Sequence, residues 1–94
     1  MNDLSIIIVN YNSGSILETL VDYLLQTLTT AEVILVDNNS SDRSADFSTQ
    51  LSSVRLISQA KNIGFGAAAN IGATAASRPI LLVLNPDCVP DEES

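Results

Sequence analysis

Four polar segments of the sequence carry the residue types that could bind a ligand, and each comes shortly after an apolar run. They are residues 10–14, 37–42, 61–66 and 85–87. Carboxylate and amide side chains in such segments can bond to the hydroxyls of a ligand, and carboxylates also bind hard cations such as Mg²⁺. The aromatic ring of Tyr11 could stack on a planar base or be an ordinary surface side chain. We therefore expect a binding site for a polar small molecule.

The second and fourth segments have a structural interpretation beside the functional one. Residues 38–41, which are Asn and Ser, are typical of turns and helix N-caps, and we interpret them in that way. Asp37 is different because it directly follows an apolar run, where its carboxylate could accept hydrogen bonds from a nucleobase or a ribose. Asn85-Pro86-Asp87 is a common strand-terminating turn. Its functional interpretation is a rigidly held carboxylate that ligates Mg²⁺ or Mn²⁺ beside a diphosphate.

Apolar runs at residues 5–9, 33–36, 54–57 and 80–84 predict four strands. Three of them are continuous rather than alternating and rich in β-branched residues, which is typical of strands covered on both faces of a parallel sheet. The run at 54–57 is interrupted by Arg55, so we place this strand at or near a sheet edge.

Helical patterns separate these runs. An apolar stripe from Ile16 to Leu28 predicts a helix, and Ser15 with Glu18 matches a capping box at its start. A weaker helix is expected from Ser41 to about Leu51, with Ala45, Phe47 and Leu51 facing inward. An alanine-rich helix is expected over residues 66–77. The order predicts an α/β fold with an open, mainly parallel four-stranded sheet, helices on both faces and a Rossmann-like topology. Ligands of such sheets bind at the carboxyl ends of the strands.

The composition excludes several classes of function. The chain has 94 residues, 11 acidic and 4 basic, with no histidine and a net charge of -7. This balance argues against nucleic acid as a partner, because affinity for nucleic acid comes largely from Lys and Arg on phosphates. Ser-His-Asp triads and zinc sites built from Cys and His are excluded as well. The single cysteine, Cys88, cannot form an internal disulfide.

The length and the N-terminal residues predict the organisation and setting of the chain. A chain of 94 residues is expected to form a single domain over 1–94. The N-terminus lacks the features of a signal peptide, and every apolar run is far shorter than the roughly 20 residues that span a membrane. We expect a reduced, cytoplasmic setting.

A dinucleotide-binding domain is the alternative that the glycines suggest. Gly64, Gly66 and Ala69 fit the pattern G-x-G-x-x-A, and Asp87 follows at roughly the spacing of 20 residues that this motif requires. However, these glycines should directly follow a strand, and that strand is usually the first of the fold. We interpret them instead as allowing close approach of the backbone to a ligand.

The four segments and their strands together resemble the family 2 glycosyltransferases of the GT-A fold. The resemblance rests on order and spacing over nearly the whole chain, in residues 5–12, 32–42, 62–66 with Asn70, and 84–87. The Asn-Pro-Asp form of the last segment is similar to the rhamnosyltransferase-like branch. The resemblance implies a nucleotide-diphospho-sugar donor, a divalent cation (Mg²⁺ or Mn²⁺) and transfer with inversion at the anomeric carbon.

The resemblance also implies the roles of single residues. In the family, the first strand end and the second-strand aspartate hold the base and ribose, which here are Tyr11 and Asp37. The family's Asp-x-Asp motif falls on Asn85 and Asp87, so metal ligation is expected at Asp87, with Asn85 contacting ribose or sugar. The full set of predicted donor-binding residues is Asn10, Tyr11, Asp37, Asn62, Gly64 and Asn85.

Members of the family are much longer, so we expect the chain to be the N-terminal, donor-binding half of such an enzyme, inactive by itself. The general base and the site for a saccharide or lipid-linked acceptor are expected in the other half, and no catalytic residue is predicted here. For the full-length protein, peripheral attachment to the inner face of the membrane is left open. A hydrophobic fourth strand at an uncovered sheet edge would allow homo-oligomers. The non-enzyme alternative is a nucleotide-binding or structural fragment.

Overall fold

The computed structural model describes residues 3–86, which form one sheet between two helical layers. The strands are β1 (Leu4–Asn10), β2 (Glu32–Asp37), β3 (Val54–Ser58) and β4 (Ile80–Leu84). Their order in the sheet is β3-β2-β1-β4, and every neighbouring pair is parallel. The four predicted strands and the parallel α/β class are therefore confirmed. Arg55 lies on β3, which is an edge strand as expected.

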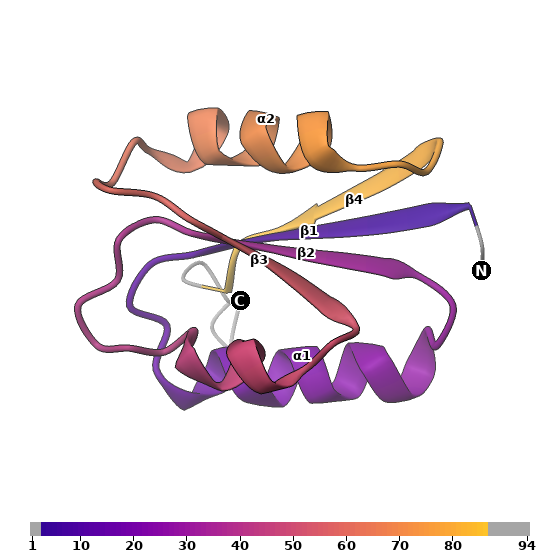
Figure 1. Ribbon diagram of the computed structural model, residues 1–94, viewed down its shortest axis with the longest axis horizontal. Helices are drawn as coiled ribbons and strands as arrows, with labels where there is room; N and C mark the ends of the chain where they lie inside the picture. The colour runs from indigo at the N-terminus through magenta and orange to yellow at the C-terminus, as the bar shows by residue number, and fades with distance from the viewer. Residues whose placement is uncertain (1–2, 87–94) are drawn as a thin grey trace, which may run out of the picture.

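The helices cover both faces of the sheet, as the alternation of elements predicts (Figure 1). Helix α1 (Ser15–Thr27) and the short 3₁₀ helix η1 (Asp46–Gln50) lie on one face. Helix α2 (Phe65–Ala75) lies on the other face, against β1 and β2. This arrangement leaves the loops at the carboxyl ends of the strands uncovered by any helix body.

Alternation along the central strands builds one core on each face. On β1, Ile6 and Ile8 pack toward Leu17 and Val21 of α1, whereas Ile7 and Val9 pack toward Ala68 of α2. The two sets alternate because successive side chains of a strand point to opposite faces. A strand covered on both faces therefore needs an unbroken apolar run, which β1 and β2 provide.

Helix α2 lies close to the sheet because small residues face it. Gly72 is buried, and a Cβ atom at this position would lie 2.4 Å from Cγ2 of Ile7 and 3.2 Å from Cγ2 of Val36. Ile7 and Val36 are both fully buried in the core and cannot move aside easily. A glycine is therefore required here by packing.

Two details of the helix predictions are wrong. The capping box is absent, because Gly14 rather than Ser15 is the N-cap and no side chain caps α1. The second helix is reduced to η1, because Arg43 has a left-handed φ of 62° and the Asp42 carboxylate accepts a hydrogen bond from the Ser44 N–H at 2.9 Å. Such a turn cannot be part of an α-helix, so helical structure starts only at Asp46.

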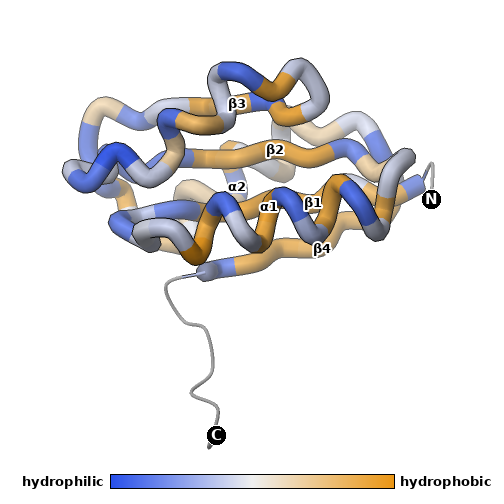
Figure 2. The backbone as a smooth tube through the Cα atoms, turned by 90° about the horizontal axis from the view of Figure 1, so that it is seen from below, coloured by the Kyte–Doolittle hydropathy of each residue, from blue (hydrophilic) through white to orange (hydrophobic). Residues whose placement is uncertain are grey.

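The prediction that the fourth strand is covered on both faces is also wrong. Residues 80–83 of β4 have exposed fractions between 39% and 49%. The strand is the outer neighbour of β1, and neither α1 nor α2 lies over it (Figure 2). The edge of the sheet formed by the described residues is therefore strongly apolar, as expected for a hydrophobic fourth strand. Among residues 3–86, no helix is long and apolar enough to cross a membrane.

Candidate functional site

The parallel register brings the ends of the strands to one edge of the sheet. Asn10 lies beside Asp37, and Asp37 lies beside Ser58. On the other side of β1, Ile8 lies beside Leu84, so Asn85 also comes to this edge. The four polar segments that the sequence singles out therefore start from the same side of the molecule (Figure 1).

Asn10 and Asp37 are joined directly at this edge. Nδ2 of Asn10 donates to Oδ1 of Asp37 at 2.7 Å and to the hydroxyls of Ser40 and Ser44 at 3.0 and 2.8 Å. The Ser40 hydroxyl in turn donates to Oδ1 of Asp37 at 2.7 Å, and the Ser40 N–H donates to Oδ2 at 3.1 Å. The carboxylate of Asp37 is thus held by groups from two strand ends.

Asn12 ties the first polar segment to the second. Its Oδ1 accepts hydrogen bonds from the N–H groups of Ser41 and Asp42, at 2.8 and 3.1 Å. Asn12 itself has a left-handed φ of 54°, which Asn tolerates better than most residues. Of residues 38–41, which the sequence suggests form a turn, Ser41 is thus held by a distant side chain, as is the following Asp42.

Asn38 has a larger role than the turn residue that the sequence suggests. Its side chain is buried, its Oδ1 accepts from the Ile63 N–H at 3.2 Å and its Nδ2 donates to the Gly64 carbonyl at 3.1 Å. A side-chain amide carries its donor and its acceptor on two separate atoms, so one Asn can bond to an N–H and to a carbonyl at once. Asn38 therefore fixes the segment before α2 against the end of β2. In that segment, Asn62 accepts from the Gly64 N–H at 2.8 Å.

Tyr11 lies in a surface hollow between the first and fourth strand ends. The hollow has a volume of about 350 Å³, and its lining residues are Tyr11, Asn12, Ser13, Ile16 and Pro86. Tyr11 is 40% exposed and therefore accessible to a ligand. Asn85 is half-buried directly before Pro86. Asp87, the predicted metal ligand, lies outside the described residues.

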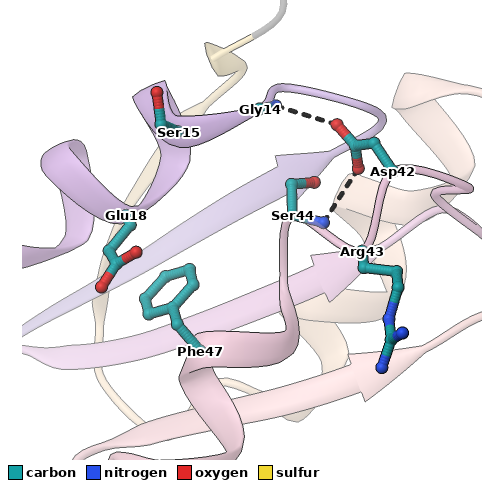
Figure 3. Close-up of a pocket in the computed structure, with 7 residues that line it drawn as sticks. All are labelled: Gly14, Ser15, Glu18, Asp42, Arg43, Ser44 and Phe47. Carbon is teal, nitrogen blue, oxygen red and sulfur yellow. Dashed lines mark hydrogen bonds between the residues drawn. The ribbon is translucent and has the colours of Figure 1, made fainter.

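A second hollow, of about 320 Å³, separates the start of α1 from residues 42–47 (Figure 3). Asp42 lies at its rim and accepts hydrogen bonds from the N–H groups of Gly14 at 3.0 Å and Ser44 at 2.9 Å. The Ser44 hydroxyl, followed by these backbone N–H groups, lowers the pKa of Asp42. With Glu18 as a second carboxylate and Arg43 paired to Asp46, the hollow would repel a diphosphate. We assign it to packing between α1 and η1.

The roles of three side chains of this site, Ser40, Ser44 and Asn38, are not indicated by their sequence pattern. Ser40 and Ser44 hold the Asn10–Asp37 pair, yet both look like ordinary turn serines, and Asn38 was interpreted as a turn residue. The one available signal was the accumulation of short polar side chains directly after a buried strand. Within residues 3–86, no three acidic, His or Cys side chains gather into a cluster that could hold a metal ion.

Comparison with known proteins decides the family. The sequence model described as Glycosyl transferase family 2 matches residues 5–94. The chain belongs to this family. The resemblance seen in the four strand ends is therefore confirmed, whereas the rhamnosyltransferase-like branch stays a prediction.

Two curated relatives are glycosyltransferases. An uncharacterized glycosyltransferase of Nostoc sp. (strain PCC 7120) is 37% identical over 92 residues, which are 92% of this chain and 28% of the relative. The glycosyltransferase GlyG of Streptococcus pneumoniae is 31% identical over 94 residues, which are 95% of this chain and 31% of the relative. This family 2 chain thus spans about 30% of the length of the curated relatives that it matches.

A solved structure shows the same fold. The mannosyltransferase PcManGT from Pyrobaculum calidifontis, in complex with GDP-Man and Mn²⁺, superposes with a TM-score of 0.79 at 19% identity. The match covers 90% of this chain and 27% of that one. The GT-A fold expected for a family 2 member is therefore confirmed, while the roles of its single residues stay predictions.

Proposed function

We propose that this family 2 chain is the N-terminal, donor-binding half of a glycosyltransferase that transfers a sugar from a nucleotide-diphospho-sugar to an acceptor, with inversion. The observation that supports it most is the placement of Asp37. Its Oδ1 accepts hydrogen bonds from the Asn10 and Ser40 side chains, and its Oδ2 accepts one from the Ser40 N–H. The half-buried carboxylate keeps an acceptor site for a ribose hydroxyl or a base N–H.

The other predicted contacts surround this carboxylate. Tyr11 would stack on the base from the hollow beside Pro86, and Asn85 would contact ribose or sugar. Asn62 and Gly64 would approach the donor from the segment before α2, which Asn38 holds in place. Asn10 is fully buried, so its predicted contact with the donor has to be indirect or requires movement.

A divalent cation suits the charge of the site. The chain carries 4 basic residues, so the diphosphate of a donor meets few positive side chains. Mg²⁺ is commonly bound by one or two carboxylates together with substrate phosphates, and Mn²⁺ has a similar preference for oxygen. We propose Asp87 as the protein ligand, with phosphate oxygens completing the set. When bound, the cation neutralises charge that develops on the departing nucleoside diphosphate.

The acceptor, a saccharide or a lipid-linked molecule, and the general base belong to the part of the enzyme outside these residues. Peripheral attachment to the inner face of a membrane belongs to the same proposal. The dinucleotide alternative is weakened because residues 59–63 separate the end of β3 from Gly64. A non-catalytic nucleotide-binding module remains the competing function for the chain.

Calorimetric titration with UDP, dTDP and GDP sugars, with and without Mn²⁺, tests the donor proposal. We expect saturable binding of one base class that depends on Mn²⁺ and weakens about tenfold in Asp37→Ala, which lacks the charged acceptor. Asp22→Asn, which changes an exposed carboxylate on α1, is the matched control and should bind like the wild type. Binding that is unaffected by Asp37→Ala would contradict the proposed site.

A coupled assay of nucleoside diphosphate release separates the enzyme from the binding module. We expect the 94-residue chain to show no acceptor-dependent release, because a general base is needed to activate the acceptor hydroxyl. Release that depends on an acceptor would refute the claim that the chain by itself is inactive.

A further inference from the structure

The amide of Asn10 combines complete burial with an incomplete set of hydrogen bonds. The side chain has an exposed fraction of 0%. Its Nδ2 has three acceptors within 3.0 Å, on Asp37, Ser40 and Ser44. Its Oδ1 is buried and has no hydrogen-bond partner among the described residues. The Nδ2 end of the amide therefore has all its hydrogen bonds. The Oδ1 end is removed from water without a hydrogen bond from another described residue, which costs free energy.

The orientation of this amide is fixed by the carboxylate that it contacts. Turning the amide around would place its oxygen against Oδ1 of Asp37 at 2.7 Å, where two acceptors repel each other. An amide that served folding alone would be expected to satisfy both ends, since most buried polar groups are paired. The amide of Asn10 is therefore oriented by its contact with Asp37 and not by a hydrogen bond to its oxygen from another described residue.

Ser40 extends the same contact. Its hydroxyl accepts from Nδ2 of Asn10 at 3.0 Å and from the Asn12 N–H at 2.9 Å, and it donates to Oδ1 of Asp37 at 2.7 Å. Because the hydroxyl oxygen accepts these two hydrogen bonds, its proton points toward Asp37. Oδ1 of Asp37 thus accepts hydrogen bonds from two side chains inside the protein, while Oδ2, the other oxygen of the carboxylate, accepts one from the Ser40 N–H.

We propose that Asn10 is a positioning residue, which holds the Asp37 carboxylate in the orientation that presents Oδ2 to the donor. The inference rests on the proposed function, in which Asp37 contacts the donor, and it replaces a direct ligand contact of Asn10 by an indirect one. Asn10 sets the rotamer of Asp37 before the donor arrives, so that binding does not have to order this side chain.

A double-mutant cycle with the full chain tests the inference. The wild type, Asn10→Ala, Asp37→Ala and the double variant are titrated by NMR with UDP, dTDP and GDP in the presence of Mg²⁺. We expect Asn10→Ala to weaken binding about tenfold and the double variant to bind like Asp37→Ala, because Asn10 acts only through Asp37. Additive losses in the double variant would overturn the inference in favour of an independent contact.

An exchanged pair separates positioning from folding. Asn10→Asp combined with Asp37→Asn restores the hydrogen bond between the two positions but moves the carboxylate into the buried one. We expect this variant to unfold at a higher urea concentration than Asn10→Asp alone, and to bind nucleotide as weakly as Asp37→Asn. Wild-type binding by the exchanged pair would show that the position of the carboxylate does not matter and would refute the inference.

Amide hydrogen exchange tests the same claim without any ligand. Asn10→Ala should speed exchange at the Ser40 N–H, which bonds to Asp37, by about tenfold, since the carboxylate loses its restraint. The Asn38 N–H, which bonds to the backbone carbonyl of Asn10, serves as the internal control. If the wild type binds no nucleotide, the proposed function fails, and this exchange experiment still decides whether Asn10 orders Asp37. Unchanged exchange at Ser40 would overturn the inference.

Discussion

Single amide side chains determine how the strand-end segments lie against one another. Asn12 fixes residues 41 and 42, and Asn38 fixes residues 63 and 64. Both use side-chain atoms in place of a backbone ladder, which allows irregular segments to be held without a helix or strand. The site is therefore an irregular surface with a defined shape.

Asn38→Ala is expected to lower the free energy of unfolding by about 1–3 kcal/mol, because it removes a buried amide whose two part-buried hydrogen bonds hold the Ile63 N–H and the Gly64 carbonyl. Urea unfolding followed by circular dichroism measures the loss. Asn70→Ala, at an exposed position of α2, is the matched control and should change stability far less. Equal stability of the two variants would contradict a bridging role for Asn38.

The residues that follow strands can be identified from the sequence, but their hydrogen-bond partners cannot. Tyr11 and Asp37 could be selected because each lies next to a buried apolar run. The hydrogen-bond partners of Asn10 are 27 to 34 positions away in the chain, so local sequence patterns cannot indicate them. Whether a serine caps a turn or holds a carboxylate depends on the register of β1 and β2, which only the folded sheet defines.

At the scale of elements, the close packing of α2 against the sheet depends on one glycine. Gly72→Ala is expected to destabilise the chain by about 1–3 kcal/mol, since its Cβ would lie 2.4 Å from Cγ2 of the buried Ile7. Gly66→Ala is the matched control on the same helix, because a Cβ there meets nothing within 4 Å. This control should leave stability unchanged or raise it by about 0.5–1 kcal/mol, and thermal unfolding measures both. A neutral Gly72→Ala would contradict the close approach of α2 to β1.

The existence of the strands and helices was predictable from the sequence. Which strands are covered by helices on both faces of the sheet was not. β-Branched apolar runs define β1, β2 and β4 equally well, yet only the first two are buried on both faces. Coverage depends on the order of strands in the sheet, which the runs do not encode. Arg55 revealed the edge at β3, but no charge marks the edge at β4.

At the scale of the whole molecule, the bare faces of β4 predict self-association. An exposed apolar edge strand can pair with a second copy, so sedimentation of the chain should depend on its concentration. Leu81→Lys places a charge on this strand and should shift the chain toward the monomer. Gln26→Lys, at an exposed position of α1, adds the same charge elsewhere and should not. A wild type that stays monomeric at all concentrations would contradict this expectation.

The end of the molecule opposite the site contains a carboxylate that links three segments. Glu32 on β2 accepts hydrogen bonds from the Ser5 hydroxyl on β1 and from the Ser77 N–H before β4, at 2.5 and 2.9 Å. The Ser5 hydroxyl, followed by the Ser77 N–H, lowers the pKa of Glu32 below its ordinary value of 4.5. Protonation of Glu32 would therefore weaken the connection between β1, β2 and β4.

The stability of the chain should accordingly fall in acid. A lowered folded-state pKa gives stability that is complete above the unfolded value of 4.5 and is lost as the pH falls through the folded value. Urea unfolding at neutral pH and below pH 4.5 measures this loss, and Glu32→Gln should be less stable at neutral pH with a smaller change in acid. A pH dependence identical to that of the wild type would contradict this role of Glu32.

The central proposal is that the donor lies at the carboxyl ends of the strands, around Tyr11 and Asp37. An NMR titration of the ¹⁵N-labelled chain with UDP, dTDP and GDP sugars in the presence of Mg²⁺ tests this most directly. We predict saturable shifts for one base class at the amides of Tyr11, Asn38 and Gly64, with none at Ser77. Saturable shifts confined to the Glu32 and Ser77 end, or no saturable shift with any of the three, would contradict it.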